Sequence, residues 1–370
     1  MKLAVITHYY APHIGGIETV AREQAQRLAA RGWAVEVFTS QLRGDPAEGT
    51  DGAVRVRRYR AFNGLESALR VPVPFPSPRM LSALRRSRPD VMLVHGHTYI
   101  SSAYASIDSR LHHIPMVLLQ HSPWVDYPAP LSWVQRFADL TIGRFTLASA
   151  NRLVAVSNHT ANYVHHVLPR AAVTVIHSGV DITRFVPSPP RIEPARVRVA
   201  TLRRLVPRQG LDTLIRAWSS SGLGNRADLV IGGTGPEENH LRQLAHGDHS
   251  ISFVGRVPEH ELVDFYAAAD VFVLPTSSGE GFGLVAAEAL ASGRPVLATA
   301  SGGPAELIRA GQDGLLVAPG DVAALRGSLS ELVDNHELRL RLSSAAAQRS
   351  LGWGHSIDAL DRVLSSVTRR

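Results

Sequence analysis

Short apolar runs alternate with longer amphipathic stretches along most of the chain. The helical spacing of apolar residues in ETVAREQAQRLAARG (18–32) predicts a helix that ends at Gly32. In the first half, we expect strands over residues 3–9, 34–40, 54–59, 91–95, 116–121, 152–157 and 173–179. This alternation of strands and helices predicts a parallel sheet that is covered by helices on both faces.

The alternation breaks at FVPSPPRIEPARV (185–197), whose four prolines indicate a linker. It resumes with expected strands over residues 197–205, 228–233, 251–255, 270–275 and 295–300. The sequence therefore predicts two similar α/β domains, over residues 1–186 and 187–351. The stretch GWGHSIDALDRVL (352–364) predicts a last helix, which the pattern alone assigns to neither sheet.

The length and composition narrow the class of protein. With 370 residues, of which 45% are hydrophobic, the chain can build two cores. It has no cysteine, which excludes disulfides and thiolate chemistry and fits a reducing compartment. No stretch approaches the roughly 18 apolar residues of a membrane span. His8 interrupts the apolar run in MKLAVITHYY, so we expect no signal peptide and a cytoplasmic protein.

The positive charge is concentrated in the first half. Of the 39 Lys+Arg and 32 Asp+Glu, residues 1–186 carry 20 and 12, giving +8, and the other 19 and 20 give −1. An anionic lipid surface, an acidic substrate or nucleic acid would suit this half, and so would a solvated arginine-rich surface. Because no nucleic-acid module is recognisable, we expect no nucleic-acid partner.

The single lysine and the missing motifs exclude some chemistry. Lys2 is the only lysine, at a poor position for the Schiff base of a pyridoxal phosphate enzyme. The phosphate-binding loop G-x-x-x-x-G-K-[ST] does not occur. His95 and His97 could bind a metal ion or line an acceptor site, but no third ligand is evident, so we expect no metal.

Several candidate site residues follow expected strands. Gly15 and Gly16 open a helix whose positive end could hold phosphate, but alone the pair is weak evidence for this, because a tight turn also explains it. In LRRLVPRQG (202–210), arginines could bind phosphate at the end of a strand, or could lie on a solvated face. In SGEGFGLVAAEALA (278–291), Glu280 and Glu288 flank a Gly-Phe-Gly, and two carboxylates of this kind can accept hydrogen bonds from sugar hydroxyls.

In combination, these motifs resemble the retaining glycosyltransferases of family 4, over nearly all of the chain. E-G-F-G-L-V-A-A-E (280–288) matches the E-x7-E motif of that family. The other matches follow in order: GGIE (15–18), RRLVPRQG (203–210), GGTGPE (232–237), FVGRVP (253–258) and ALASGRPVLATASGGPAELI (289–308). The resemblance implies an α/β GT-B fold, with two facing Rossmann-like domains and a cleft between them. It also implies that the last helix, within residues 352–370, crosses back to the first domain.

The resemblance implies a role for each matching residue. Glu280 should hold the transferred sugar and Glu288 the ribose of the nucleotide. Arg204 should neutralise the diphosphate leaving group, and His121 matches the cleft histidine of the family, so His121, Glu280 and Arg204 are the expected catalytic residues. The expected donor-binding residues are Gly15, Gly16, Arg204, Arg208, Gln209, Arg256, Val257, Glu280, Gly281, Phe282, Gly283, Leu284 and Glu288.

The sequence departs from the family pattern at two places. Gln209 stands where the family commonly has lysine, and Arg208 or Arg203 is a candidate replacement for the lost charge. His177-Ser178-Gly179 stands where Pro-Asn-Gly is usual.

The implied activity is transfer of a sugar from a UDP- or GDP-sugar to a hydroxyl of a glycan, a glycolipid or a small molecule. The resemblance implies retention by same-face attack, with neither metal nor cofactor. The alternatives are a GT-B-fold epimerase or hydrolase that acts on nucleotide sugars, and a sugar-nucleotide binding protein without catalysis.

A peripheral contact with the inner face of the membrane is a further hypothesis for the basic half. It rests on the proline-rich, basic segment 69–88 and on PLSWVQRFADLTIGRF (130–145), where Trp133, Phe137 and Leu140 share one helical face. An ordinary helix whose apolar face packs into the core explains the second segment at least as well.

Overall fold

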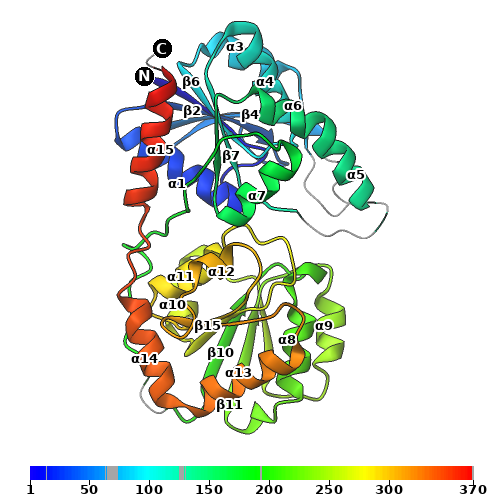
Figure 1. Cartoon of the computed structure of the whole chain (residues 1–370), viewed down its shortest axis with the longest axis vertical. Helices are drawn as coiled ribbons and strands as arrows, with labels where there is room; N and C mark the ends of the chain where they lie inside the picture. The colour runs from blue at the N-terminus through cyan, green and yellow to red at the C-terminus, as the bar shows by residue number, and fades with distance from the viewer. Residues whose placement is uncertain are drawn as a thin grey trace. The chain divides into compact units, whose positions relative to one another are not determined.

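The computed structural model describes residues 1–13, 15–62, 64, 74–124, 129, 131–191 and 194–368. The chain forms two compact units (Figure 1). Unit 1 comprises Met1–Ser178 together with Gly354–Arg370, and unit 2 comprises Gly179–Trp353. The domain boundaries predicted from the sequence lie at residues 186/187 and 351/352, whereas the compact units divide at residues 178/179 and 353/354.

Unit 1 is built on a largely parallel sheet with the strand order β3-β4-β2-β1-β6-β7-β8-β9 in the described part of the chain. Its parallel strands, all of which the apolar runs predict, are β1 (Lys2–Ile6), β2 (Ala34–Gln41), β4 (Val54–Phe62), β6 (Val91–His95), β7 (Met116–Gln120), β8 (Arg152–Ala155) and β9 (Val173–Val175). The interior strands β1, β6 and β7 are apolar almost throughout because helices cover both faces of the sheet.

Two short strands correct the expectation of a purely parallel sheet. β3 (Glu48–Asp51) and β5 (Phe75–Pro76) both pair antiparallel with β4. The residues of β3, EGTD, contain no apolar position, so hydrophobic periodicity could not reveal this edge strand.

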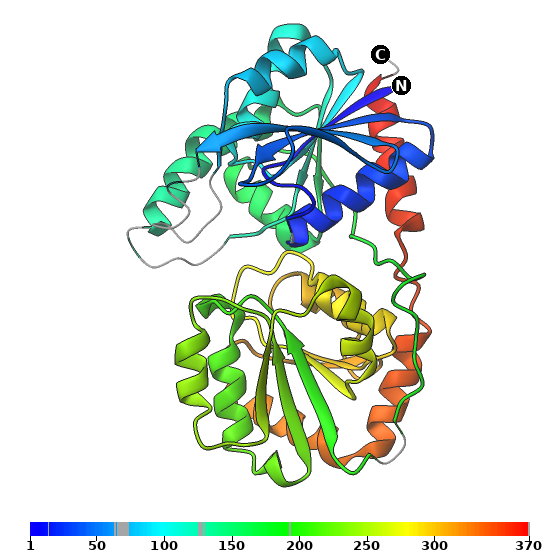
Figure 2. The ribbon, with the colours of Figure 1, turned by 180° about the vertical axis from the view of Figure 1, so that it is seen from behind.

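The helices of unit 1 follow the predicted alternation. In the described residues they are α1 (Gly16–Ala30), α3 (Arg79–Ser87), α4 (Ile100–His112), α5 (Leu131–Ala138), the π-helix η1 (Asp139–Gly143), α6 (Arg144–Ser149), α7 (Asn158–Val167) and α15 (Trp353–Thr368). Figures 1 and 2 both show α15, the last helix, alongside α1. The indole Nε1 of Trp33 donates to Asp361 Oδ1 at 2.9 Å, and Arg31 pairs with Asp358.

The segment around α5 has its apolar face in solvent. Trp133 and Phe137 are 77% and 71% exposed, and Leu140 in η1 is also exposed. The alternative interpretation of this segment as a core-facing helix is therefore wrong. The other basic segment forms α3 with its arginines exposed, whereas residues 69–73 lie outside the described residues.

Unit 2 is a parallel sheet with the strand order β12-β11-β10-β13-β14-β15. Its strands are β10 (Val197–Leu202), β11 (Ala227–Gly232), β12 (Ile251–Gly255), β13 (Val271–Leu274), β14 (Val296–Thr299) and β15 (Gly314–Val317). Its α-helices are α8 (Leu211–Ser219), α9 (Glu238–Leu244), α10 (Leu262–Ala267), α11 (Leu284–Ala291), α12 (Gly303–Leu307), α13 (Val322–Asp334) and α14 (His336–Ala347). Its short 3₁₀ turns are η2 (Pro207–Gln209), η3 (Leu223–Asn225) and η4 (Glu259–Glu261).

The core of unit 2 lies between the sheet and its helices. Figure 1 shows α8, α9 and α13 on one side of the sheet and α10, α11 and α12 on the other. Leu214 and Trp218 of α8 pack in one apolar cluster with Leu329 of α13, and all three are fully buried. We did not expect β15 from the sequence, because its four residues GLLV are too short for a periodic signal.

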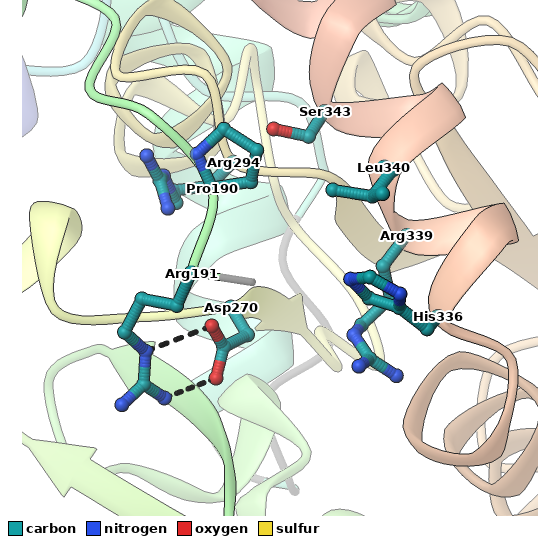
Figure 3. A pocket seen from close by; sticks show the side chains of 8 residues that line it. All are labelled: Pro190, Arg191, Asp270, Arg294, His336, Arg339, Leu340 and Ser343. Atoms are coloured by element: carbon teal, nitrogen blue, oxygen red, sulfur yellow. Dashed lines mark hydrogen bonds and ion pairs between the residues drawn. The ribbon is translucent and has the colours of Figure 1, made fainter. Parts of the chain in front are cut away.

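A small pocket lies beside the amino-terminal ends of β13 and β14 (Figure 3). Arg191 forms a two-pronged ion pair with Asp270, and the buried guanidinium of Arg294 donates to Ser188 Oγ at 2.6 Å and to the carbonyl of Ala269 at 3.1 Å. The cavity volume is ≈ 10 Å³, about the space of one water molecule. Arg191 and Arg294 therefore connect the proline-rich segment before β10 to the residues that precede β13 and β14.

Candidate functional site

The strand order of unit 2 reverses next to its first strand. β10 lies between β11 and β13, so the loops that follow β10 and β13 leave the sheet side by side. In open parallel sheets, ligands bind outside the carboxyl ends of the strands at such a switch point. Arg203 follows β10, and Glu280 lies in the loop between β13 and α11.

Both carboxylate oxygens of Glu280 have a donor. Oε1 accepts a hydrogen bond from the backbone N–H of Gly283 at 3.1 Å, and Oε2 lies 2.5 Å from Nη2 of Arg203. Charge-assisted hydrogen bonds of this kind fix the orientation of a carboxylate. Glu280 is thus held in place by its own loop and by the residue that follows β10.

A neighbouring glycine allows the loop of Glu280 to pack closely on the next loop. A Cβ at Gly303 would lie 2.2 Å from the carbonyl oxygen of Gly281, which no side chain tolerates. The N–H of Gly303 also donates to the carbonyl of Glu280 at 3.0 Å. Gly303, which follows β14, therefore allows the loop after β13 to pack closely against it.

Gln209 completes the cluster around Arg203. The side-chain carbonyl Oε1 of Gln209 accepts a short hydrogen bond from Nη2 of Arg203, and both residues are buried. Arg204, one residue further, is exposed. Arg208 donates to the carbonyl of Gly279 at 3.3 Å.

Glu288, in α11, has a partner that the sequence did not indicate. The hydroxyl of Tyr266 in α10 donates to Glu288 Oε2 at 2.7 Å. Burial raises the pKa of Glu288 to about 7, although the hydrogen bond from Tyr266 acts in the opposite direction. The pKa of Tyr266 is itself raised, by burial and by the nearby carboxylate.

The remaining donor-binding candidates of unit 2 lie near this edge of the sheet. Arg256, which is exposed, and Val257 follow β12. Phe282 is buried in the loop of Glu280, and Leu284 is the first residue of α11. Arg203 therefore joins Glu280 to Gln209, Gly283 contacts Glu280 directly, and neither Arg204 nor Arg256 belongs to that cluster.

Histidines gather at the corresponding edge of unit 1, where its strand order reverses between β1 and β6. Nδ1 of His95 lies 2.9 Å from Nε2 of His121, and both side chains are buried. Burial lowers the pKa of His121 to about 3 and that of His95 well below its ordinary value. Both imidazoles are therefore neutral at neutral pH.

The amino-terminal turn of α1 already holds a carboxylate. Nε2 of His8 and Nδ1 of His13 lie 3.4 and 3.2 Å from Oε1 of Glu18. Burial would raise the pKa of Glu18, but the hydrogen bonds from the two histidines outweigh it and keep this pKa below its usual range. A Cβ at Gly15 would lie 2.3 Å from Oε2 of Glu18, whereas one at Gly16 would meet open space.

His97, another buried histidine, has partners that the sequence did not indicate. The two ring nitrogens of His97 face Gln120 Oε1 and Asp139 Oδ1, each at 3.0 Å. Because the amide nitrogen of Gln120 donates to the carbonyl of Ser122, its Oε1 accepts the hydrogen bond from Nδ1 of His97. His97 thus links the ends of β6 and β7 to Asp139 of the π-helix η1.

The described residues contain neither a candidate metal cluster nor a membrane-spanning helix. Among them, no group of three or more His, Cys, Asp or Glu side chains is arranged to hold a metal ion. Within the same residues, no helix has the length and apolar character needed to cross a bilayer.

Comparison with known proteins identifies the family. The family model described as Glycosyltransferase Family 4 matches residues 14–184, and the one described as Glycosyl transferases group 1 matches residues 188–349. The GDP-mannose-dependent alpha-(1-6)-phosphatidylinositol monomannoside mannosyltransferase of Mycobacterium tuberculosis is 30% identical over 94% of this chain and 93% of its own length. The chain belongs to glycosyltransferase family 4.

Another relative supports this family assignment, and two solved structures share the fold. D-inositol 3-phosphate glycosyltransferase 1 of Catenulispora acidiphila is 31% identical over 95% of this chain and 90% of its own length. Sucrose-phosphate synthase from Thermosynechococcus elongatus superposes with a TM-score of 0.82, at 21% identity and over 100% of this chain and 99% of that one. HepE of Anabaena in complex with UDP and glucose superposes with a TM-score of 0.77, at 19% identity and over 99% and 100% of the chains.

These findings confirm the predicted α/β GT-B class with two Rossmann-like units. They also confirm that this member of family 4 is a nucleotide-sugar-dependent glycosyltransferase.

The raised pKa of Glu288 can be measured directly. In ¹³C NMR titrations of labelled glutamate, we expect Glu288 to titrate with a pKa of about 7. In Tyr266→Phe the pKa should rise further, because the lost hydroxyl favoured the ionised carboxylate. Tyr104→Phe in unit 1 is the matched control and should leave it unchanged. A Glu288 pKa near the ordinary value of 4.5 would contradict the account.

The raised pKa of Glu288 also determines how the stability of the fold depends on pH. The folded chain binds the proton of Glu288 more tightly than the unfolded chain does. The contribution of Glu288 to the free energy of unfolding is therefore fully present below about pH 4.5 and is lost as the pH rises through about 7.

Proposed function

We propose that the protein is a retaining, metal-independent hexosyltransferase whose unit 2 binds the nucleotide-sugar donor at the switch point of its sheet. The observation that carries this proposal is the fixed placement of two glutamates with different partners. Glu280 is held by Arg203 and Gly283, and Glu288 by Tyr266. In the proposed complex, Glu280 accepts hydrogen bonds from the transferred sugar and Glu288 from the ribose.

The contacts of Glu280 favour retention without a covalent enzyme intermediate. A carboxylate that is paired with an arginine and a backbone N–H is a poor nucleophile, although it can still accept hydrogen bonds from hydroxyls. The acceptor hydroxyl then attacks from the face that the diphosphate leaves, and the leaving phosphate takes its proton. Charge on the leaving group is stabilised by guanidinium groups and by the N–H groups at the start of α11.

The contributions of unit 1 are proposed from the family resemblance. Gly15 and Gly16 would contact the donor phosphates, and His121 would orient the sugar. Burial lowers the pKa of His121 and of His95, so the two imidazoles carry no charge at neutral pH. A neutral imidazole can orient a sugar hydroxyl through a hydrogen bond. Arg204, Arg208, Arg256 and Val257 remain proposed contacts to the diphosphate and the base.

The relatives suggest the chemistry of donor and acceptor. The names of both curated relatives include an inositol group that bears a phosphate, and one of them also names GDP-mannose. We therefore propose a GDP- or UDP-sugar donor and an anionic acceptor that carries a free hydroxyl. The basic first half of the chain would attract such an acceptor.

Calorimetric titration of UDP, GDP, ADP and TDP tests donor binding. At least one should bind, and Glu288→Gln should weaken it by roughly tenfold, because a charged acceptor for the ribose hydroxyls is lost. Affinity should also rise with pH through about 7, as Glu288 becomes ionised. Glu331→Gln, which changes an exposed glutamate in α13, is the matched control. If no nucleotide binds at millimolar concentration, the proposal fails.

Turnover of the sugar donor that carries the bound nucleotide separates the transferase from its rivals. Transfer should require an acceptor, should proceed in EDTA and should give a product with the anomeric configuration of the donor. Rapid hydrolysis or epimerisation without acceptor would support the alternative enzyme classes.

The exposed face of α5 supports contact with a membrane. Trp133 and Phe137 are largely exposed, and the exposed side chains of Arg136 and Arg144 flank them. Apolar side chains beside arginines are typical of segments that lie in the interface of anionic lipid bilayers. We therefore propose that unit 1 meets the membrane through this face.

Vesicle cosedimentation tests this contact. The wild-type protein should bind phosphatidylglycerol-rich vesicles at low salt, and the double variant Trp133→Ser/Phe137→Ser should lose most of that binding. Leu111→Ser is the control, because Leu111 is also largely exposed but lies on α4. Absence of wild-type binding at low salt would remove the membrane hypothesis.

A further inference from the structure

Arg203 is the buried cation of the switch point in unit 2. Its side chain is only 6% exposed, although it follows a strand at an edge where its neighbour Arg204 points into solvent. Removing a guanidinium from water is costly unless acceptors replace the water. Glu280 and Gln209 supply acceptors at one nitrogen of this guanidinium, Nη2, and a bound ligand would supply acceptors at the others.

The contacts of Arg203 leave part of its donor capacity unused. Nη2 serves both Glu280 Oε2 and Gln209 Oε1. Among the described residues, none accepts a hydrogen bond from its Nε or Nη1. A guanidinium carries five N–H donors in a planar fork, which matches the oxygens of phosphate groups.

The side chain of Gln209 orients the guanidinium of Arg203 through a hydrogen bond. Its carbonyl oxygen faces the guanidinium, so its side chain orients the positive charge and supplies none itself. Gln209 lies in η2, immediately before α8, where backbone N–H groups add a positive potential.

We propose that Arg203, oriented by Gln209, contributes a positive charge to the binding of the donor diphosphate, and that it also fixes Glu280 for the sugar. This inference rests on the proposed function. It adds Arg203 to the proposed diphosphate contacts of Arg204 and Arg208, as a charge that stabilises the leaving group from a buried position.

The experiment compares nucleoside diphosphates with uncharged nucleosides. GDP, UDP, guanosine and uridine are titrated into the wild type, Arg203→Gln, Arg204→Gln and the control Arg216→Gln. Arg216 is an exposed arginine of α8, so its variant accounts for the lost net charge. Arg203→Gln should weaken the bound diphosphate on the order of 10- to 100-fold and leave the affinity for its nucleoside unchanged.

A second variant moves the charge instead of removing it. In Arg203→Gln/Gln209→Lys, the cation returns on the neighbouring side chain and again faces Glu280. This variant should recover most of the diphosphate affinity, which a purely structural role of Arg203 does not predict. It decides the question even if Arg203→Gln folds poorly.

The outcomes separate the inference from the proposed function. The inference is overturned if Arg203→Gln binds diphosphate as well as Arg216→Gln does, or if the relocated charge fails to restore binding. If the wild type binds neither GDP nor UDP, the proposed function fails as well.

Discussion

The ion pair between Arg203 and Glu280 joins the two loops on which the candidate site of unit 2 depends. One loop follows β10 and the other follows β13, and the reversed strand order makes these strands neighbours. A buried charge requires a partner of opposite sign. This requirement fixes both loops relative to each other and positions Glu280 before any ligand binds.

The two glutamates of the E-x7-E motif lie in different environments. Glu280 has a cation and a backbone N–H at its carboxylate, whereas the partner of Glu288 among the described residues is a tyrosine hydroxyl, and burial raises the pKa of Glu288 to about 7. Environments that separate two carboxyl groups in this way allow them to serve different roles. The first is suited to a contact whose orientation the ion pair fixes, and the second to one that ionises near neutral pH.

The sequence predicted the architecture well because buried parallel strands are apolar over their whole length. It missed β3, whose four residues are polar or glycine, and β15, which is too short to show periodicity. It identified the E-x7-E glutamates through the family motif. It named Arg204 through the resemblance and gave Arg203 only as a candidate replacement for the lost charge at Gln209. The contacts of Arg203 with Glu280 and Gln209 depend on side-chain directions after β10, which alternate along an extended chain and are not visible in the pattern.

Partners far apart in the sequence were also beyond prediction. Tyr266 and Glu288, or His97 and Asp139, meet only because the sheets bring their elements together. Nothing in the local pattern of either partner marks the contact. The apolar face of α5 shows the opposite case, because the pattern was visible but its exposure was decided by tertiary packing.

The most direct test of the central claim is a crystal structure of the complex with GDP or UDP, whichever binds. The account predicts that the diphosphate lies against the guanidinium of Arg203 at the carboxyl ends of β10 and β13, and that Glu288 accepts hydrogen bonds from the ribose. A nucleotide bound elsewhere on the molecule, or one whose diphosphate makes no contact with Arg203, would contradict it.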